Sequence, residues 1–231
     1  MNERQGVPVE RVERRAATPI AGASAGILFA VLFAVSVSII YTSMSALPTD
    51  TGSWLDTAAG RFKFAIALVP FAGLFFLWFI AAARERLGRF EDQFFATVFL
   101  GSGLLFTAMI FAAAASAGAI AGTYTRDPAA FASSTTYLYA RHMVAQIFNV
   151  YALRMAAVFL ISQATLWLRT GVMPRRTVLP TYGIALVLLF IVSQSIWVVL
   201  VFPAWVFVVS IYILFTHLRG SGQAEVSKGS R

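Results

Sequence analysis

Arg154 is the residue whose type and position most strongly suggest chemistry in this sequence. It lies within a long apolar run, residues 143–168, and a charged side chain at the centre of a bilayer costs about 2.5–3.5 kcal/mol on insertion scales. A guanidinium has five N–H donors and no acceptor, so at that depth it can bind an anionic or carbonyl-bearing ligand. A structural interpretation stays open beside this one. The side chain can instead extend to the membrane surface, or donate hydrogen bonds to helix carbonyls.

Other polar residues lie in the apolar runs at positions that favour a ligand site. Gln146 and Asn149 are three residues apart, so on an α-helix they share one face. Ser36 and Gln194 lie near the ends of two further runs, on the same side of the membrane if every run crosses it. The sequence therefore predicts a polar vestibule that opens to the outside, with Arg154 at its floor. Its ligand-binding residues would be Arg154, Asn149, Gln146, Gln194 and Ser36. Alternatively, these groups hydrogen-bond one another between packed helices.

Several other chemistries lack the residues that they need. The chain has no Cys and two His, His142 and His217, which fall at opposite ends of the predicted spans and cannot share a metal or a haem. All ten acidic residues lie in loops or tails, so the spans hold no carboxylate for a proton relay or an intramembrane aspartyl protease. We therefore expect a protein that is not an enzyme and has no cofactor and no metal site.

The composition identifies the surroundings of these residues as a lipid bilayer. Of 231 residues, 59% are hydrophobic and 12% charged, whereas soluble domains have roughly 45–50% apolar and about 25% charged residues. This excludes an ordinary soluble domain and a disordered chain. The formal net charge is +8, and the basic residues gather at the ends of apolar runs, where anionic lipid head groups attract them. We expect the lipid bilayer as a partner, and no nucleic acid.

Six apolar segments predict an all-α fold, a polytopic bundle of six transmembrane helices. A helix needs about 20 apolar residues to cross the hydrocarbon core. The predicted spans are residues 20–41, 64–83, 94–121, 143–168, 178–198 and 204–217, in a transmembrane domain of residues 18–219 with tails at 1–17 and 220–231. The last two spans come from one run that is too long for a single crossing. Pro203, between Trp197 and Trp205, predicts the turn that divides it.

The basic residues also predict the orientation. With six spans and both termini in the cytoplasm, 13 of the 18 Lys and Arg residues lie on the cytoplasmic side, four lie outside and one is Arg154. Such an asymmetry is what the positive-inside rule predicts. With five spans, the basic C-terminal tail would be outside.

Part of the chain resembles a set of uncharacterised bacterial multipass membrane proteins. The resemblance covers most of residues 64–174 and depends on the segments RERLG at 84–88, EDQFFAT at 91–97, YALRM at 151–155 and LWLRTG at 166–171. It implies a multipass protein of the bacterial inner membrane. It implies no activity and no catalytic residue.

Small residues predict close helix contacts. Gly22 and Gly26 form one small-xxx-small pair, and Gly118 and Gly122 form another. Such faces pack helices within one chain, or bind a second copy or another membrane protein. Two functions are therefore open. The first is a non-enzymatic protein that binds or passes a small anionic or polar solute through the vestibule, and the second is a structural or assembly subunit that docks another membrane protein.

Overall fold

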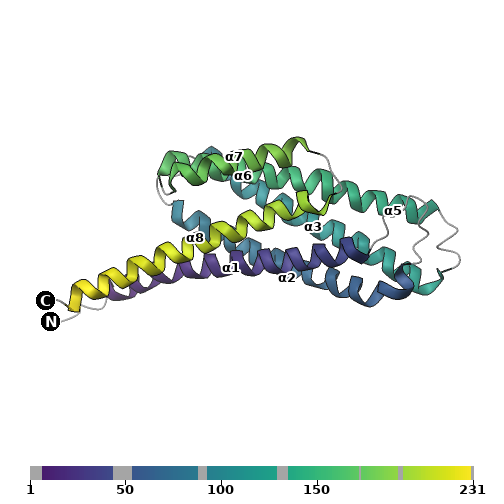
Figure 1. The fold of residues 1–231 in the computed structure, drawn as a ribbon, viewed down its shortest axis with the longest axis horizontal. Helices are drawn as coiled ribbons and strands as arrows, with labels where there is room; N and C mark the ends of the chain where they lie inside the picture. Colours follow the sequence, from purple (N-terminus) through teal and green to yellow (C-terminus); the bar gives the residue numbers. More distant parts are fainter. Residues whose placement is uncertain are drawn as a thin grey trace.

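The structure is a computed structural model that describes residues 7–43, 54–87, 93–128, 135–171, 173–191 and 195–229. This part of the chain is helical, with no strand, as predicted. Its elements are α1 (Val7–Ser43), α2 (Leu55–Leu87), α3 (Gln93–Arg126), α5 (Thr135–Gln146), the π-helical segment η2 (Ile147–Ala152), α6 (Leu153–Thr170), α7 (Arg175–Phe190) and α8 (Ile196–Gly229). The helices form an elongated bundle (Figure 1).

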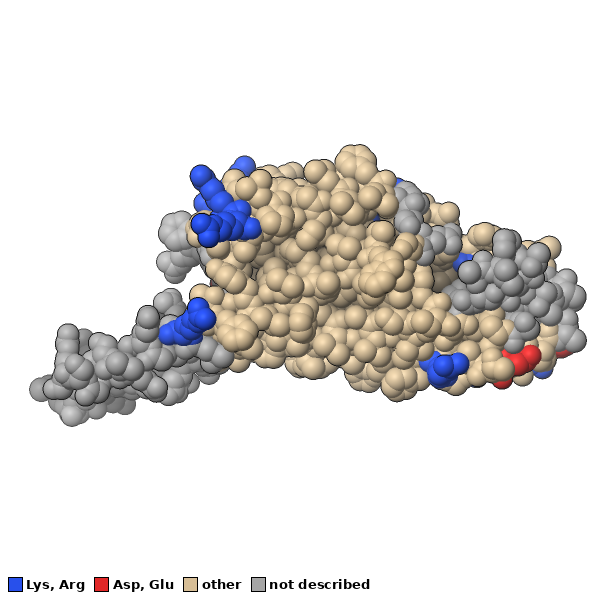
Figure 2. Space-filling model, viewed as in Figure 1, with Lys and Arg blue, Asp and Glu red and all other residues tan. Residues whose placement is uncertain are grey.

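Five helical segments of the described chain are long and apolar enough to cross a membrane: Ile20–Ser43, Leu55–Glu85, Phe94–Arg126, Thr135–Thr170 and Ile196–His217. Large apolar side chains are exposed along their outer faces, such as Phe71 (59% exposed) and Trp78 (56%). Basic side chains instead gather mostly toward the ends of the bundle, and the visible surface between them is formed by uncharged residue types and His (Figure 2). Lipid rather than water suits such a surface. The structure therefore agrees with a multipass helical membrane protein.

The first four predicted spans, residues 20–41, 64–83, 94–121 and 143–168, lie inside observed helices, but the division of the last apolar run was wrong. The break follows Phe190, and α8 continues from Ile196 through Pro203. A proline removes one backbone donor, and a membrane helix packed against neighbours tolerates this loss. The backbone leaves the helical conformation at Ile191, which is extended (φ −84°, ψ 107°). The predicted spans 178–198 and 204–217 are corrected accordingly.

One phenylalanine holds most of the bundle together. The ring of Phe76 on α2 lies 4.6 Å from Phe29 of α1, 5.2 Å from Phe106 of α3, 5.3 Å from Phe159 of α6 and 5.7 Å from Phe202 of α8, measured between ring centroids. All five side chains are at most 1% exposed. These distances and the mostly tilted or edge-on geometries are those that aromatic rings prefer. We call these five residues the phenylalanine core.

Hydrogen bonds of hydroxyl groups attach α7 to α6 and α8, and a tryptophan pair joins α6 to α8. Trp205 of α8 donates its indole N–H to Thr181 Oγ1 over 2.9 Å, and the hydroxyls of Thr165 and Tyr182 lie 2.7 Å apart. The rings of Trp167 and Trp205 stack at 5.8 Å. α7 has 16 residues, or about 24 Å of helix, which is shorter than the hydrocarbon core.

A smaller apolar cluster lies toward the end of the bundle that is remote from α1's first residue. α2, α3 and α5 contribute its buried members, Leu55, Phe62, Ala117, Ile120, Ala121, Tyr124 and Tyr137. Tyr124 donates a hydrogen bond to Asp56 Oδ1 over 2.7 Å, which links α3 to the start of α2. We call this group the outer cluster. It lies apart from the phenylalanine core.

The phenylalanine core gives a direct test. Replacing Phe76 with Ala removes ring contacts to four other helices, and we expect it to lower the free energy of unfolding by about 3–5 kcal/mol. Phe71→Ala is the matched control on the same helix, because Phe71 is 59% exposed. It should change stability by no more than about 0.5 kcal/mol. Unfolding curves in mixed detergent micelles measure both values, and equal losses would contradict the assignment of Phe76 as the central contact.

Candidate ligand-binding site

A cavity of about 220 Å³ lies between the two apolar clusters. α1, α2, α3, α5 and η2 all contribute to its wall. Val69 and Ile110 line it on the side of the larger apolar cluster, which contains the phenylalanine core. Phe62 and Ile120 line it on the side of the outer cluster. Its lining residues include several from the last turns of α1 and from much of α5. These segments lie at the end of the bundle opposite the first turns of α1 and the last turns of α8 (Figure 1).

The cavity exists because α3 offers small side chains where other helices offer large ones. Ala113, Ala114 and Ala117 line it from α3, and a methyl group cannot reach across to the facing helices. Aromatic side chains from the other elements surround the remaining space without filling it, among them Phe33 and Phe148. Larger apolar residues at the alanine positions would have closed the space, because protein interiors pack densely.

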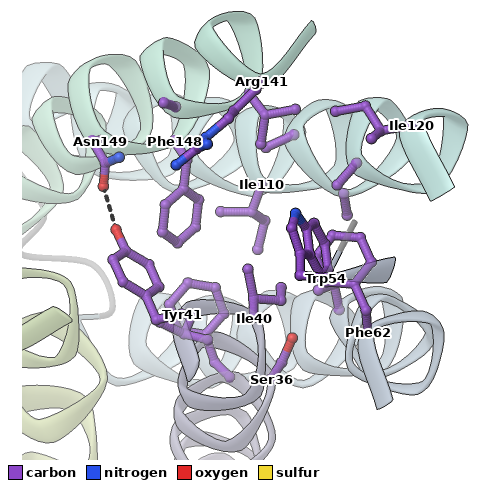
Figure 3. A pocket seen from close by; sticks show the side chains of 18 of the residues that line it. Ser36, Ile40, Tyr41, Trp54, Phe62, Ile110, Ile120, Arg141, Phe148 and Asn149 are labelled. Carbon is purple, nitrogen blue, oxygen red and sulfur yellow. Dashed lines mark hydrogen bonds between the residues drawn. The ribbon is translucent and has the colours of Figure 1, made fainter. Parts of the chain in front are cut away.

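Asn149 provides a buried amide on the cavity wall. The side chain is 8% exposed, and its Oδ1 accepts a 2.7 Å hydrogen bond from the hydroxyl of Tyr41 on α1 (Figure 3). The Nδ2 end of the amide has no hydrogen-bond acceptor among the described residues. In Figure 3 this nitrogen points into the cavity. An amide nitrogen carries two N–H donors, so the wall presents donors at this point.

The position of Asn149 depends on the π-helical segment η2. A π-helix makes i→i+5 hydrogen bonds and so holds more residues per turn than an α-helix. Asn149 follows Gln146 by three residues, and across the wider turn these two side chains no longer share a face. Asn149 is buried, whereas Gln146 is exposed and does not line the cavity. The predicted pairing of Gln146 with Asn149 is therefore wrong, because it assumed α-helical geometry throughout.

The predicted floor of the site is also wrong. Arg154 does not line the cavity, and its Nη1 donates a 3.0 Å hydrogen bond to the carbonyl of Val150 on its own helical run. This contact agrees with the structural interpretation of Arg154, in which the side chain donates hydrogen bonds to helix carbonyls. Ser36 lines the cavity, and its hydroxyl donates to the carbonyl of Ala65 over 2.7 Å. Gln194 lies outside the described residues.

Sequence reasoning did not assign several polar groups of the wall to the site. Arg141 on α5 directs its guanidinium toward the side where Asn149 and Phe148 lie (Figure 3). The indole N–H of Trp54 donates to the hydroxyl of Tyr137 over 3.1 Å. Tyr41 was also overlooked, although a tyrosine at the end of an apolar run provides a hydroxyl at that depth. Arg141 had been counted only as a loop charge, since the helical run was expected to begin at residue 143.

The predicted small-residue contacts have separate outcomes. A Cβ at Gly22 would collide with Ala82 of α2, and a Cβ at Gly26 would collide with Ser210 of α8 and Phe79 of α2. These two glycines therefore permit helix packing within the chain. The contacts around the second pair are looser. A Cβ at Gly118 would only touch Ile66 at 4.0 Å, and one at Gly122 would meet nothing within 4 Å among the described residues.

Comparison with known proteins adds no functional information about this site. No protein-family model matches the chain, and no curated protein and no solved structure matches it. The functional interpretation therefore depends on the cavity and its lining.

Proposed function

We propose that this protein is a binding protein of the bacterial inner membrane that holds a small, largely apolar molecule in the cavity. The single observation that carries the proposal is the cavity itself. A concave space lined by apolar and aromatic side chains, with a few placed polar groups, is the usual form of a ligand site. Its volume of about 220 Å³ exceeds the roughly 150 Å³ that suffices for benzene in an engineered apolar cavity.

The phenylalanine core favours binding over passage. Phe33 lines the cavity and lies 5.4 Å from Phe29 of the core, measured between ring centroids. The rings beyond Phe29 touch one another across α1, α2, α3, α6 and α8. A solute that entered the cavity would meet these packed rings before it reached the other end of the bundle. We therefore favour a site that takes up and releases its ligand at one end.

The polar groups on the wall support binding without turnover. They are the hydroxyls of two tyrosines, the indole N–H of Trp54, a carboxamide, a guanidinium and the hydroxyl of Ser36, which already donates to a carbonyl. A carboxamide does not titrate, a guanidinium stays protonated and a tyrosine has an ordinary pKa of about 10. These groups can orient a ligand by hydrogen bonds, but none of them is suited to general-base catalysis near pH 7.

The alternative of an assembly subunit has less support. Its docking faces were the small-residue pairs, and Gly22 and Gly26 are used for contacts inside the chain. The open surroundings of Gly122 among the described residues do not identify a partner.

Six crossings with both termini in the cytoplasm form part of the proposal. The first turns of α1 and the last turns of α8 lie at the same end of the bundle (Figure 1), which requires an even number of crossings if the bundle spans the membrane. α7 would be the short crossing that makes the number even. The predominance of Lys and Arg on the proposed cytoplasmic side supports the same orientation.

A pair of double variants on α3 tests binding. Ala114→Leu with Ala117→Leu, the filled variant, places side chains in the cavity, whereas Ala115→Leu with Ala119→Leu, the surface variant, changes exposed positions. We expect wild type and surface variant in lipid nanodiscs to take up α-methylstyrene saturably, above the uptake of empty nanodiscs. At 100 times the dissociation constant the probe should stabilise both by about 2.7 kcal/mol. The filled variant should fold and bind none, and equal uptake by all three proteins would contradict the proposal.

Single cysteines test the crossings, because the natural chain has no Cys. Thr136→Cys at the start of α5, Arg176→Cys at the start of α7 and Arg219→Cys on α8 each replace an exposed residue. In intact cells, a membrane-impermeant maleimide should label only the Thr136→Cys protein. The other two should react only after the membrane is permeabilised. External labelling of the Arg219→Cys protein would show that α7 does not cross.

A further inference from the structure

We propose that the ligand of the cavity carries an oxygen acceptor on a carbonyl or carboxylate carbon, and that this oxygen binds the Nδ2 group of Asn149. This inference rests on the proposed function and names the chemical class of the ligand. Its structural basis is the side-chain amide of Asn149. Asn149 is 8% exposed, and its Nδ2 has no acceptor among the described residues.

The amide of Asn149 is oriented before a ligand arrives. Tyr41 donates to Oδ1 over 2.7 Å, which fixes the plane of the amide and directs Nδ2 into the cavity (Figure 3). The N–H groups of Nδ2 face the cavity, and no described residue accepts a hydrogen bond from them. An acceptor on the ligand gains this hydrogen bond, whereas a hydrocarbon of the same shape does not. The wall therefore favours a ligand with an acceptor at this point.

The other polar groups of the wall favour the same assignment. The hydroxyl of Ser36 and the indole N–H of Trp54 already donate to Ala65 and Tyr137. The guanidinium of Arg141 lines the cavity on the side of Asn149 (Figure 3), and a guanidinium only donates. A positive charge beside the amide attracts the negative end of a carbonyl dipole, or a carboxylate.

The opposite side of the cavity is apolar. Trp54, Phe62 and Ile120 lie across the cavity from Asn149 and Tyr41 (Figure 3). A ligand would therefore lie with its acceptor at Asn149 and its apolar body against these side chains. The volume of about 220 Å³ limits that body to approximately one ring with a short substituent.

The π-helical segment supports a ligand role for this point of the wall. π-Helical turns are rare, and those inside α-helices occur frequently at functional sites. η2 interrupts the run from α5 to α6 at Ile147–Ala152, and Asn149 is one of its two buried residues, with Ala152. The local geometry thus presents the one carboxamide of this wall to the cavity.

Two probes of the same shape test the inference. Acetophenone and α-methylstyrene differ only in C=O against C=CH₂, and each can be measured by equilibrium dialysis against protein in nanodiscs. Uptake by the filled variant gives the blank for lipid partitioning. Wild type should bind acetophenone about tenfold more tightly than α-methylstyrene, as expected for one hydrogen bond to a buried donor. Asn149→Leu should abolish this preference, so that the two probes bind the variant with equal affinity.

The outcomes separate this inference from the proposed function. If neither probe binds wild type saturably, the proposed binding function fails. If both bind with equal affinity, or if Asn149→Leu retains the preference, only the acceptor inference is overturned. Asn149→Asp is a second variant that preserves the size of the side chain and replaces its donors with acceptors, so it too should lose the preference for acetophenone. Benzoate then assigns the head group: tighter binding than acetophenone indicates a carboxylate beside Arg141, and weaker binding a neutral carbonyl.

Discussion

The contact of Phe76 with four other phenylalanine rings is the interaction on which the rest of the structure depends. In a bilayer the hydrophobic effect does not drive helices together, since lipid tails are as apolar as the side chains. Close packing and specific contacts must supply the stability instead. A ring on α2 that touches α1, α3, α6 and α8 meets this requirement at one level of the bundle. It fixes the position of helices that are far apart in sequence.

The same packing explains why a cavity can persist beside the core. The phenylalanine core holds α1, α2 and α3 at one level, and the outer cluster holds α2, α3 and α5 at another. Between these levels the alanines of α3 leave space, and the helices cannot collapse into it without disturbing one cluster or the other. The bond from Tyr41 to Asn149 then joins α1 to η2 across that space. A preformed site of this kind loses little free energy to reorganisation when a ligand binds.

The sequence predicted those features that follow from apolar length, and failed where local backbone geometry decides. The helices that contain residues 20–41, 64–83, 94–121 and 143–168 were predictable because long apolar runs have few alternatives in lipid. The continuation of α8 through Pro203 was not predictable, because packing of the helix outweighs the loss of one backbone donor. Ser36 and Asn149 both line the cavity, whereas Arg154 and Gln146 do not. The wider turn of η2, which separates Gln146 from Asn149, cannot be read from a periodicity of 100° per residue.

The chain contains two asparagines, Asn2 and Asn149, which permits a direct measurement of the central claim. In protein labelled with ¹⁵N-asparagine, NMR records two side-chain amide groups, and Asn149→Leu assigns them by removing one. Addition of acetophenone should shift the Asn149 amide protons downfield, with saturation at one ligand per chain, and leave Asn2 unchanged. An Asn149 signal that does not move while the probe occupies the protein would contradict the account.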